Sequence, residues 1–303
     1  MRSLYWGVVI GIIGLSGRGA ILASQVPASS SSSAAARAEV DRLIAASGAE
    51  VAVVWQPLEA SDGRSPVLIH ADLRFHAAST MKLPVMIALF QQVATGLLRL
   101  DDPVLVTNQF HSIVDGSVYE LSASEDSDGE TYKAIGKPMT LRALCEAMIT
   151  VSSNLAANNL IERLGARTIQ ATVDRLGAGG MQVLRGVEDQ KAFDAGKNNT
   201  TNAAGLATLL TKLGRGEVLS PEASAEMIGV LRRQKLNDAI PAGLPAGTVI
   251  AHKTGTITRI HHDAGIVYGP RPYVLVVLVR GIQDQRVSAK LIADVARVVN
   301  GIR

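Results

Sequence analysis

The sequence contains a single cysteine, Cys145, in a chain of 303 residues. One thiol excludes an intrachain disulfide and a metal site built from several cysteines. Cys145 lies in the helical pattern TLRALCEAMITV, so we interpret it as a buried structural thiol rather than a nucleophile. A chain of this length can bury enough apolar surface to be stable without disulfides.

Aromatic residues and net charge are also scarce. Aromatic side chains make up 4% of the chain, and the formal net charge is +3. Lysine and arginine are scattered along the chain and form no basic block. Without a basic patch or a series of aromatic platforms, the composition does not predict nucleic-acid binding.

The apolar run at the N-terminus, Leu4 to Leu15, has twelve residues and is too short to span a bilayer comfortably. Arg2 precedes it, and small residues follow it, with Ala23 as a plausible cleavage position. This pattern predicts a secretory signal peptide over residues 1–23 and an exported protein, periplasmic or secreted, with no stable membrane span after cleavage. Arg18 interrupts the end of the run, so an uncleaved anchor stays open as an alternative.

A Ser/Ala-rich stretch follows the predicted signal peptide. It includes VPASSSSSAAA and predicts a flexible linker over residues 24–36. We find no internal repeat in the sequence. We expect residues 37–303 to form one functional domain and the protein to be a monomer.

Hydrophobic periodicity predicts the order helix, strands, many helices, strands and a final helix. The expected helices cover residues 35–47, 83–98, 140–151, 152–164, 202–214, 221–233 and 286–299, and the expected strands 49–57, 67–70, 248–253, 263–268 and 273–279. Residues 103–137 are polar and read as a long irregular segment. The order favours an α/β protein of the α+β kind: an antiparallel sheet from both chain ends, flanked by helices, and an all-helical lobe. A cleft between the two parts is a common place for a small-molecule site.

The stretch HAASTMKLPVMIALFQQ places Ser79 three residues before Lys82 at the start of a buried helix. Three residues are close to one helical turn, so both side chains share a face. A serine becomes a nucleophile when a base lies within hydrogen-bond reach, and a helix N-terminus offers free N–H groups to an oxyanion. The alternative is a helix cap at Ser79 and a lysine that extends to water.

Two further short motifs follow in the chain. Ser152-Ser153-Asn154 stands at the junction of two expected helices, and Lys253-Thr254-Gly255-Thr256 ends an expected apolar strand. With Ser79 to Lys82, their order and spacing match the serine, S-x-N and K-T-G motifs of penicillin-recognising serine enzymes. The sequence resembles the class A β-lactamase family over most of residues 36–303, including MITVSSNLAANNLI and NNTTNAAGLATLL.

The resemblance implies a β-lactamase fold and hydrolysis of a β-lactam ring through an acyl-enzyme. Ser79 would be the nucleophile, Lys82 its base, and Ser152 the donor of a proton to the leaving nitrogen. Lys82 could accept a proton if burial and the charge of Lys253 lower its pKa. We expect no cofactor.

The resemblance also assigns substrate contacts. Asn154 would bind the amide side chain of the substrate, and Lys253, Thr254 and Thr256, on either side of Gly255, would bind its carboxylate. The N–H of Thr256 would be the second donor to the oxyanion.

The chain departs from the family pattern at the deacylating carboxylate. The family has R-x-E followed by L-N, whereas this chain has Arg185-Gly186-Val187-Glu188-Asp189 without a following Leu-Asn. Glu188, one residue later than the pattern requires, is either the base that activates water or a surface ion-pair partner, and Asp189 is the next candidate. Ser153 replaces a family aspartate whose role is mainly structural.

Without the deacylating base the acyl-enzyme would persist. Two alternative functions follow: a DD-peptidase of the penicillin-binding type, acting on cell-wall peptide, and a β-lactam sensor that does not turn over.

Other candidate groups give weaker signals. His261-His262-Asp263 could suggest a metal, but neighbouring strand residues point to opposite faces and no second cluster completes a site, so we predict no metal. Arg259 could assist carboxylate binding or be solvated, and Tyr119 could flank the cleft. The acidic run at residues 125–130 is interpreted as a solvated turn.

Overall fold

The computed structural model describes residues 32–302. The predicted signal peptide and most of the predicted linker lie outside the described residues. Helix α1 (Ser33–Ser47) begins two residues before its predicted start, so residues 33–36, assigned to the linker, are helical. No helix among residues 32–302 is long and apolar enough to cross a membrane.

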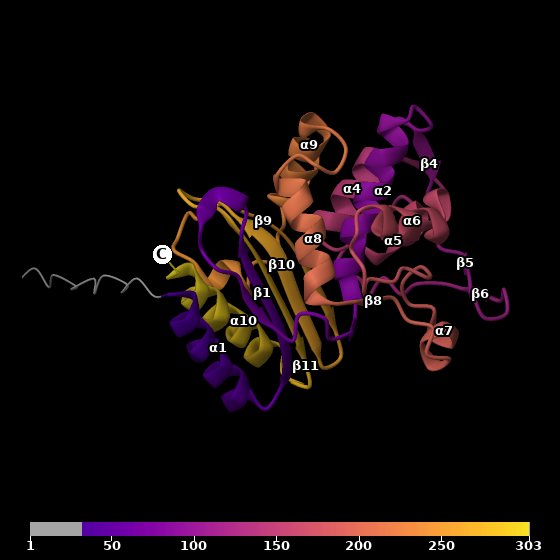
Figure 1. The fold of residues 1–303 in the computed structure, drawn as a ribbon. Coiled ribbons are helices and arrows are strands. Elements are labelled where there is room, and N and C mark those ends of the chain that lie inside the picture. The colour runs from indigo at the N-terminus through magenta and orange to yellow at the C-terminus, as the bar shows by residue number, and fades with distance from the viewer. Residues whose placement is uncertain (1–31, 303) are drawn as a thin grey trace, which may run out of the picture.

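A five-stranded sheet in the order β2-β1-β11-β10-β9 lies in one half of the molecule, with helices on both of its faces (Figure 1). Every neighbouring pair of its strands is antiparallel. The strands are β1 (Glu50–Pro57), β2 (Val67–Ile69), β9 (Ile250–Ile257), β10 (Ile260–Val267) and β11 (Tyr273–Arg280). Both ends of the chain therefore contribute to one sheet, which confirms the predicted α+β fold.

Side chains on the two faces of the sheet enter different apolar clusters. On β11, Val276 and Leu278 pack towards the helical lobe, whereas Val277 and Val279 pack towards α1 and α10 (Gln285–Asn300). This alternation follows from the two-residue repeat of a strand. Because both faces are covered, YVLVVLVR is apolar at almost every position.

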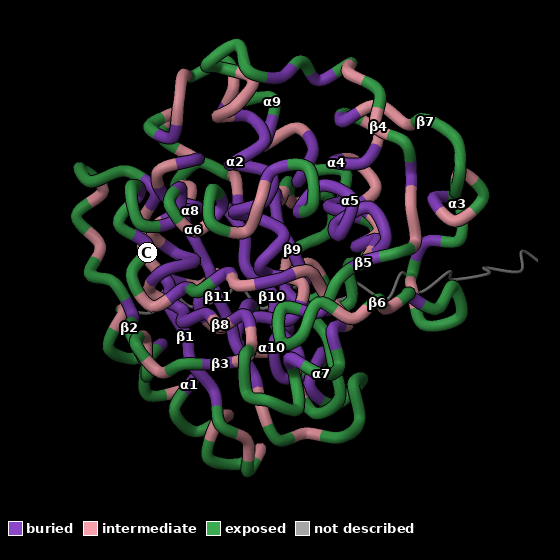
Figure 2. Tube along the Cα trace, turned by 90° about the vertical axis from the view of Figure 1, so that its right-hand side faces the viewer, coloured by how far each residue is buried: buried purple, intermediate pink, exposed green. Residues whose placement is uncertain are grey.

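The remaining long helices gather on the other face of the sheet. They are α2 (Lys82–Ala94), α4 (Leu141–Thr150), α5 (Asn154–Leu164), α6 (Ala166–Arg175), α8 (Ala203–Gly214) and α9 (Pro221–Leu231). Helix α2 is buried from Lys82 to Phe90 and forms the centre of the lobe, while α8 packs directly on the sheet. Figure 2 shows the buried trace concentrated in these central helices and in β10 and β11.

The remaining elements are short. They are β3 (Phe75–His76) paired with β8 (Thr200–Thr201), β4 (Pro103–Leu105) with β7 (Pro138–Thr140), β5 (Phe110–His111) with β6 (Val118–Tyr119), helices α3 (Gly129–Tyr132) and α7 (Gln190–Asp194), and the 3-10 turns η1 (Ala60–Asp62), η2 (Ala78–Met81) and η3 (Pro241–Gly243). Several of them lie in the segment predicted to be irregular.

Candidate active site

Ser79 lies in the 3-10 turn η2, between β3 and α2. The helix proper begins at Lys82, so the prediction that Ser79 opens the α-helix is wrong by three residues. Ala78, with a φ of 45°, cannot belong to a right-handed α-helix, and residues 78–81 form the 3-10 turn that precedes α2. This backbone conformation exposes Ser79 partly, whereas Thr80 and Lys82 are buried.

Lys82 is fully buried, with an exposed fraction of 0%. Its Nζ donates hydrogen bonds to the Ser152 carbonyl oxygen at 2.6 Å and to Asn154 Oδ1 at 2.6 Å, and lies 3.3 Å from Ser152 Oγ. Burial lowers the pKa of Lys82 to about 7, and the charges of Asp126 and Glu188 oppose this shift. A substantial fraction of Lys82 is therefore neutral near pH 7.

Ser152 lies between α4 and α5 with a φ of 62°, an uncommon conformation for serine. Lys253 Nζ donates to Ser152 Oγ at 3.0 Å and to the Thr254 carbonyl oxygen at 2.9 Å. Burial, and then the charge of Lys82, lower the pKa of Lys253. The Ser152 hydroxyl thus stands between two buried lysines. Its neighbour Ser153 caps α5 by accepting from the Ala156 N–H.

Asn154 connects Lys82 to Glu188. The Asn154 side chain accepts from Lys82 through Oδ1 and donates through Nδ2 to Glu188 Oε1 at 2.5 Å. Glu188 therefore points inward, and of the two roles left open by the sequence this geometry favours the internal carboxylate over a surface ion-pair partner. Burial raises the pKa of the Glu188 carboxyl, while the bond from Asn154 opposes the rise.

Asp189 occupies a different place. Its carboxylate accepts from Ser112 Oγ and from the N–H groups of Ile113 and Ala192, so it caps α7 and ties the loop to its neighbour. With these three donors satisfied, Asp189 has a structural role.

Strand β9 forms the free edge of the sheet beside Ser79. A two-residue turn joins Ile257 to Ile260, which makes these two residues a hydrogen-bonded pair. By alternation, the N–H and C=O groups of Thr254 and Thr256 face away from β10. The bond from Lys253 to the Thr254 carbonyl agrees with this orientation. The Thr256 N–H is thus free on the side that borders the cavity.

The prediction that the K-T-G motif ends its strand is wrong, because β9 continues to Ile257. Gly255 lies inside the strand and passes very close to the serine turn. A Cβ atom at Gly255 would lie 3.0 Å from the Thr80 backbone nitrogen and 3.1 Å from that of Ser79. A glycine here lets the strand edge approach the nucleophile.

Asp126 is a site residue that the sequence analysis missed. Its Oδ2 accepts from the backbone N–H groups of Asn154 and Leu155, at 2.9 and 3.0 Å, and so holds the N-terminus of α5. Asp126 is half-buried and Asp128 is buried. The interpretation of residues 125–130 as a solvated turn is therefore wrong for these two carboxylates. No local sequence pattern predicts the role of Asp126, because its two partners are 28 and 29 residues distant along the chain.

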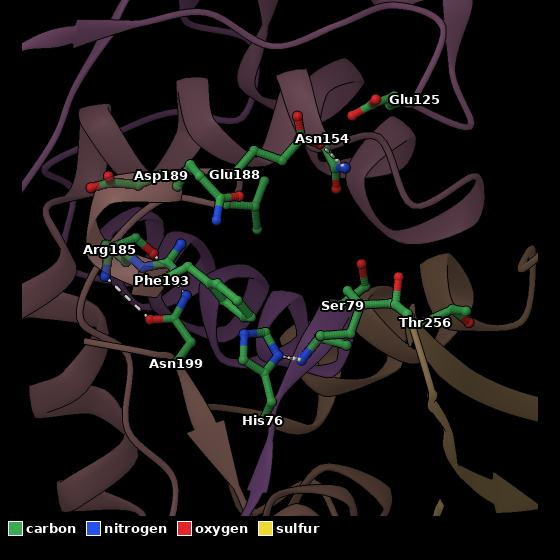
Figure 3. Close-up of a pocket in the computed structure, with 15 residues that line it drawn as sticks. His76, Ser79, Glu125, Asn154, Arg185, Glu188, Asp189, Phe193, Asn199 and Thr256 are labelled. Atoms are coloured by element: carbon green, nitrogen blue, oxygen red, sulfur yellow. Dashed lines mark hydrogen bonds between the residues drawn. The ribbon is translucent and has the colours of Figure 1, made fainter. Parts of the chain in front are cut away.

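A cavity of about 650 Å³ brings these groups together. Its lining includes Ser79, Asn154, Glu188 and Thr256, together with His76, Arg185, Phe193 and Asn199, which the sequence did not single out as cavity residues (Figure 3). Lys82 and Lys253 lie beneath this surface and are 0% and 1% exposed. The Thr254 side chain borders a second cavity with Asn237 and Gln285.

Three weaker candidates lie elsewhere. The Tyr119 hydroxyl donates to the Val187 carbonyl oxygen, so Tyr119 supports the loop before Glu188. Arg259 is in the turn after β9 and donates to the Gly281 carbonyl oxygen. His261 and His262 face opposite sides of the sheet, towards Ser288 Oγ and the His76 carbonyl oxygen respectively, in agreement with the prediction.

Comparison with known proteins identifies the family. Residues 35–302 match the model of the Beta-lactamase enzyme family. Beta-lactamase AST-1 of Nocardia asteroides is 31% identical over 260 residues, which cover 84% of this chain and 79% of the relative. The extended-spectrum beta-lactamase PER-1 of Pseudomonas aeruginosa is 25% identical over 272 residues, 86% of this chain and 84% of the relative.

Solved structures of two proteins have a similar fold. The ancestral class A β-lactamase GNCA superposes with a TM-score of 0.75 at 28% identity, covering 88% of this chain and 98% of that one. The structure of PBP-A gives a TM-score of 0.75 at 28% identity, covering 88% and 94%. The chain belongs to the β-lactamase enzyme family.

Proposed function

We propose that this protein is a serine β-lactamase that hydrolyses β-lactams through an acyl-enzyme on Ser79. The observation that carries the proposal is the hydrogen-bonded series Lys253–Ser152–Lys82–Asn154–Glu188, of which Asn154 and Glu188 line the same cavity as Ser79, while the two lysines lie beneath its surface. Each catalytic step needs one of these groups, and hydrogen bonds fix each side chain in turn.

In acylation, neutral Lys82 accepts the proton of Ser79 while Ser79 Oγ bonds to the β-lactam carbonyl carbon. The N–H groups of Ser79 and Thr256 stabilise the oxyanion. The C–N bond then breaks, and the Ser152 hydroxyl donates its proton to the leaving nitrogen. Lys82 Nζ, 3.3 Å from Ser152 Oγ, then gives Ser152 a proton, so Ser152 and Lys82 return to their starting states and the net transfer is one proton from Ser79 to the ring nitrogen.

Substrate binding favours this proton transfer. A substrate carboxylate at Lys253, Thr254 and Thr256 stabilises the cationic form of Lys253. The charges of Lys253 and Lys82 disfavour each other, so a proton held at Lys253 favours the neutral form of Lys82. Asn154, whose amide already lies in the cavity wall, contacts the acylamide side chain of the substrate.

In deacylation, Glu188 accepts a proton from a water molecule whose oxygen attacks the ester carbonyl. The ester bond breaks, and the proton returns to Ser79 Oγ. A raised pKa brings the Glu188 carboxyl closer to the working pH, which suits a group that takes up and releases a proton.

A DD-peptidase or a sensor that keeps its acyl-enzyme would need no carboxylate beside the ester. The inward position of Glu188 therefore supports turnover over both alternatives. We further propose that a signal peptide over residues 1–23 exports the protein to the periplasm or the medium, where as a monomer it would confer resistance to β-lactam antibiotics.

The decisive experiment measures labelling and turnover separately. Purified wild-type protein should hydrolyse a chromogenic cephalosporin at a steady rate, and Ser79→Ala should lose both this activity and covalent labelling by a fluorescent penicillin. Ser122→Ala, at an exposed serine of the same lobe, is the matched control and should behave as wild type. Labelling that survives in Ser79→Ala would identify another nucleophile. A wild-type burst without steady turnover would favour the peptidase or sensor.

A further inference from the structure

The residue before the nucleophile has a strained backbone. Ala78 has a φ of 45°, in a region that residues with a Cβ atom rarely occupy, and it is buried. Such a conformation persists only where surrounding contacts hold it, and it often occurs at functional sites. The φ angle of Ala78 depends on the orientation of the Ala77–Ala78 peptide group.

That peptide group is held at both ends. The Ala77 carbonyl oxygen accepts from the Thr80 N–H at 3.1 Å and from Thr80 Oγ1 at 2.6 Å. The Ala78 N–H donates to His76 Nδ1 at 3.0 Å (Figure 3). The second contact belongs to no regular element, and only a nitrogen without a proton can accept it.

The surroundings of His76 favour the neutral imidazole that this contact requires. Burial, and then the charge of Arg185, lower the pKa of His76 to about 4, so the ring is neutral at neutral pH. With Nδ1 as the acceptor, the proton resides on Nε2. The ring packs edge to face on Phe193 of α7, with 5.9 Å between centroids, and this contact fixes its plane.

A second histidine holds the other side of His76. His262 on β10 contacts the His76 carbonyl oxygen through Nε2 at 2.9 Å, while His262 Nδ1 accepts from the Val279 N–H at 3.2 Å. His262 must therefore donate through Nε2. Burial lowers its pKa to about 4 as well. The His262 imidazole thus fixes the peptide group between His76 and Ala77. The His76 imidazole fixes the next one, between Ala77 and Ala78.

We propose that His76 is a positioning residue for Ser79: its Nδ1 holds the strained Ala77–Ala78 peptide group and thereby directs the N–H and hydroxyl of Ser79 into the cavity. His76 acts through the turn rather than on the reacting atoms. The inference rests on the proposed function where it concerns acylation, and it adds a residue that none of the three motifs contains.

Three variants of His76 test the proposal by the rate of acylation with a fluorescent penicillin. His76→Asn places an amide oxygen near the position of Nδ1, whereas His76→Leu offers no acceptor. His76→Gln reaches the position of Nε2 and leaves Nδ1 unreplaced. We expect Leu and Gln to slow acylation roughly 3- to 10-fold, the range for one lost hydrogen bond, and Asn to stay within about twofold of wild type. If the His76→Leu variant does not fold, the His76→Gln variant alone tests the loss of the acceptor at Nδ1.

The strain itself gives a second, independent readout. In an Ala78→Gly background the turn needs no support against a Cβ clash, so the loss caused by His76→Leu should shrink to about twofold or less. A thermal melt of each variant separates this effect from general destabilisation. Equal losses in both backgrounds, or an Asn variant as slow as Leu, would overturn the proposal.

The ¹⁵N spectrum of the wild-type imidazoles decides the contact without any activity. We expect His76 to be neutral with Nδ1 unprotonated at pH 7, and a protonated Nδ1 would refute the positioning role. If the wild-type protein is not labelled by penicillin at all, the proposed function fails, while this spectrum still tests the hydrogen bond at Ala78.

Discussion

Replacing Glu188 by glutamine separates the two halves of the proposed reaction. Glutamine has nearly the same shape as glutamate, and its amide oxygen can accept the hydrogen bond that Asn154 Nδ2 gives to Glu188 Oε1 at 2.5 Å. The cavity wall should therefore stay in place. What is lost is the carboxylate that can take a proton from water.

The expected magnitude follows from these two roles. A positioned general base contributes about 10²- to 10⁴-fold, so deacylation of Glu188→Gln should slow by that factor. Acylation should not slow, because the negative charge of Glu188 favours protonated Lys82. Removing that charge lowers the pKa of Lys82 and increases its neutral fraction.

Intact mass spectrometry measures the outcome directly. After mixing with a penicillin, Glu188→Gln should accumulate the Ser79 ester at a near-wild-type rate and keep it, while the wild type returns to its free mass. Glu125→Gln is the matched control, because Glu125 is an exposed carboxylate at the rim of the same cavity. If Glu188→Gln turns over like wild type, or if Glu125→Gln stalls instead, the assignment of Glu188 is wrong.

Three further outcomes are expected. Acylation by the wild type should fall about tenfold per pH unit below about pH 7, since protonated Lys82 cannot accept a proton, and the midpoint should move to lower pH in Glu188→Gln; a flat stopped-flow profile would contradict this. Lys253→Ala should cost about 2 kcal/mol, or roughly 30-fold in kcat/KM, for substrates with a free carboxylate, and much less for their esters. Gly255→Ala should slow acylation by about 10- to 100-fold, because the added methyl displaces the Thr80 backbone from β9, and unchanged kinetics would exclude this close approach.

The sequence predicted the fold and the three motifs well because each depends on local pattern. Apolar periodicity located α2 and β11, and the spacing of Ser79 and Lys82 placed the two residues one turn apart near the start of α2, although Ser79 lies in the preceding 3-10 turn η2. The meeting of Ser152 with Lys253 is different. These residues are 101 positions apart, and their hydrogen bond was not predicted: periodicity cannot bring them together, and the resemblance only assigned both residues to the same site.

Two errors in the predicted secondary structure share a physical cause. Helix α6 was not predicted, and it lies in a stretch of mixed polarity whose apolar face is narrow. The early end assigned to β9 came from reading Thr254 and Gly255 as the end of an apolar run, although pairing with β10 continues through Thr256 to Ile257. In each case tertiary partners outweigh weak local preference.

Asn154 shows how the site can hold a lysine and a carboxylate close together without an ion pair between them. A protonated lysine only donates and a carboxylate only accepts, so Lys82 on one side and Glu188 on the other permit a single orientation of the amide between them. Lys82 can donate a hydrogen bond to Asn154 Oδ1 whether it is protonated or neutral, so the orientation of the amide persists in both states. It weakens when Glu188 is protonated and offers a hydrogen of its own. The amide therefore couples the two proton acceptors: each is held in place by the other through one side chain, and neither needs a direct ion pair that would keep Lys82 charged. A buried lysine with amide and carbonyl partners retains the lowered pKa that acylation requires, while the carboxylate stays near enough to serve the water in the second step.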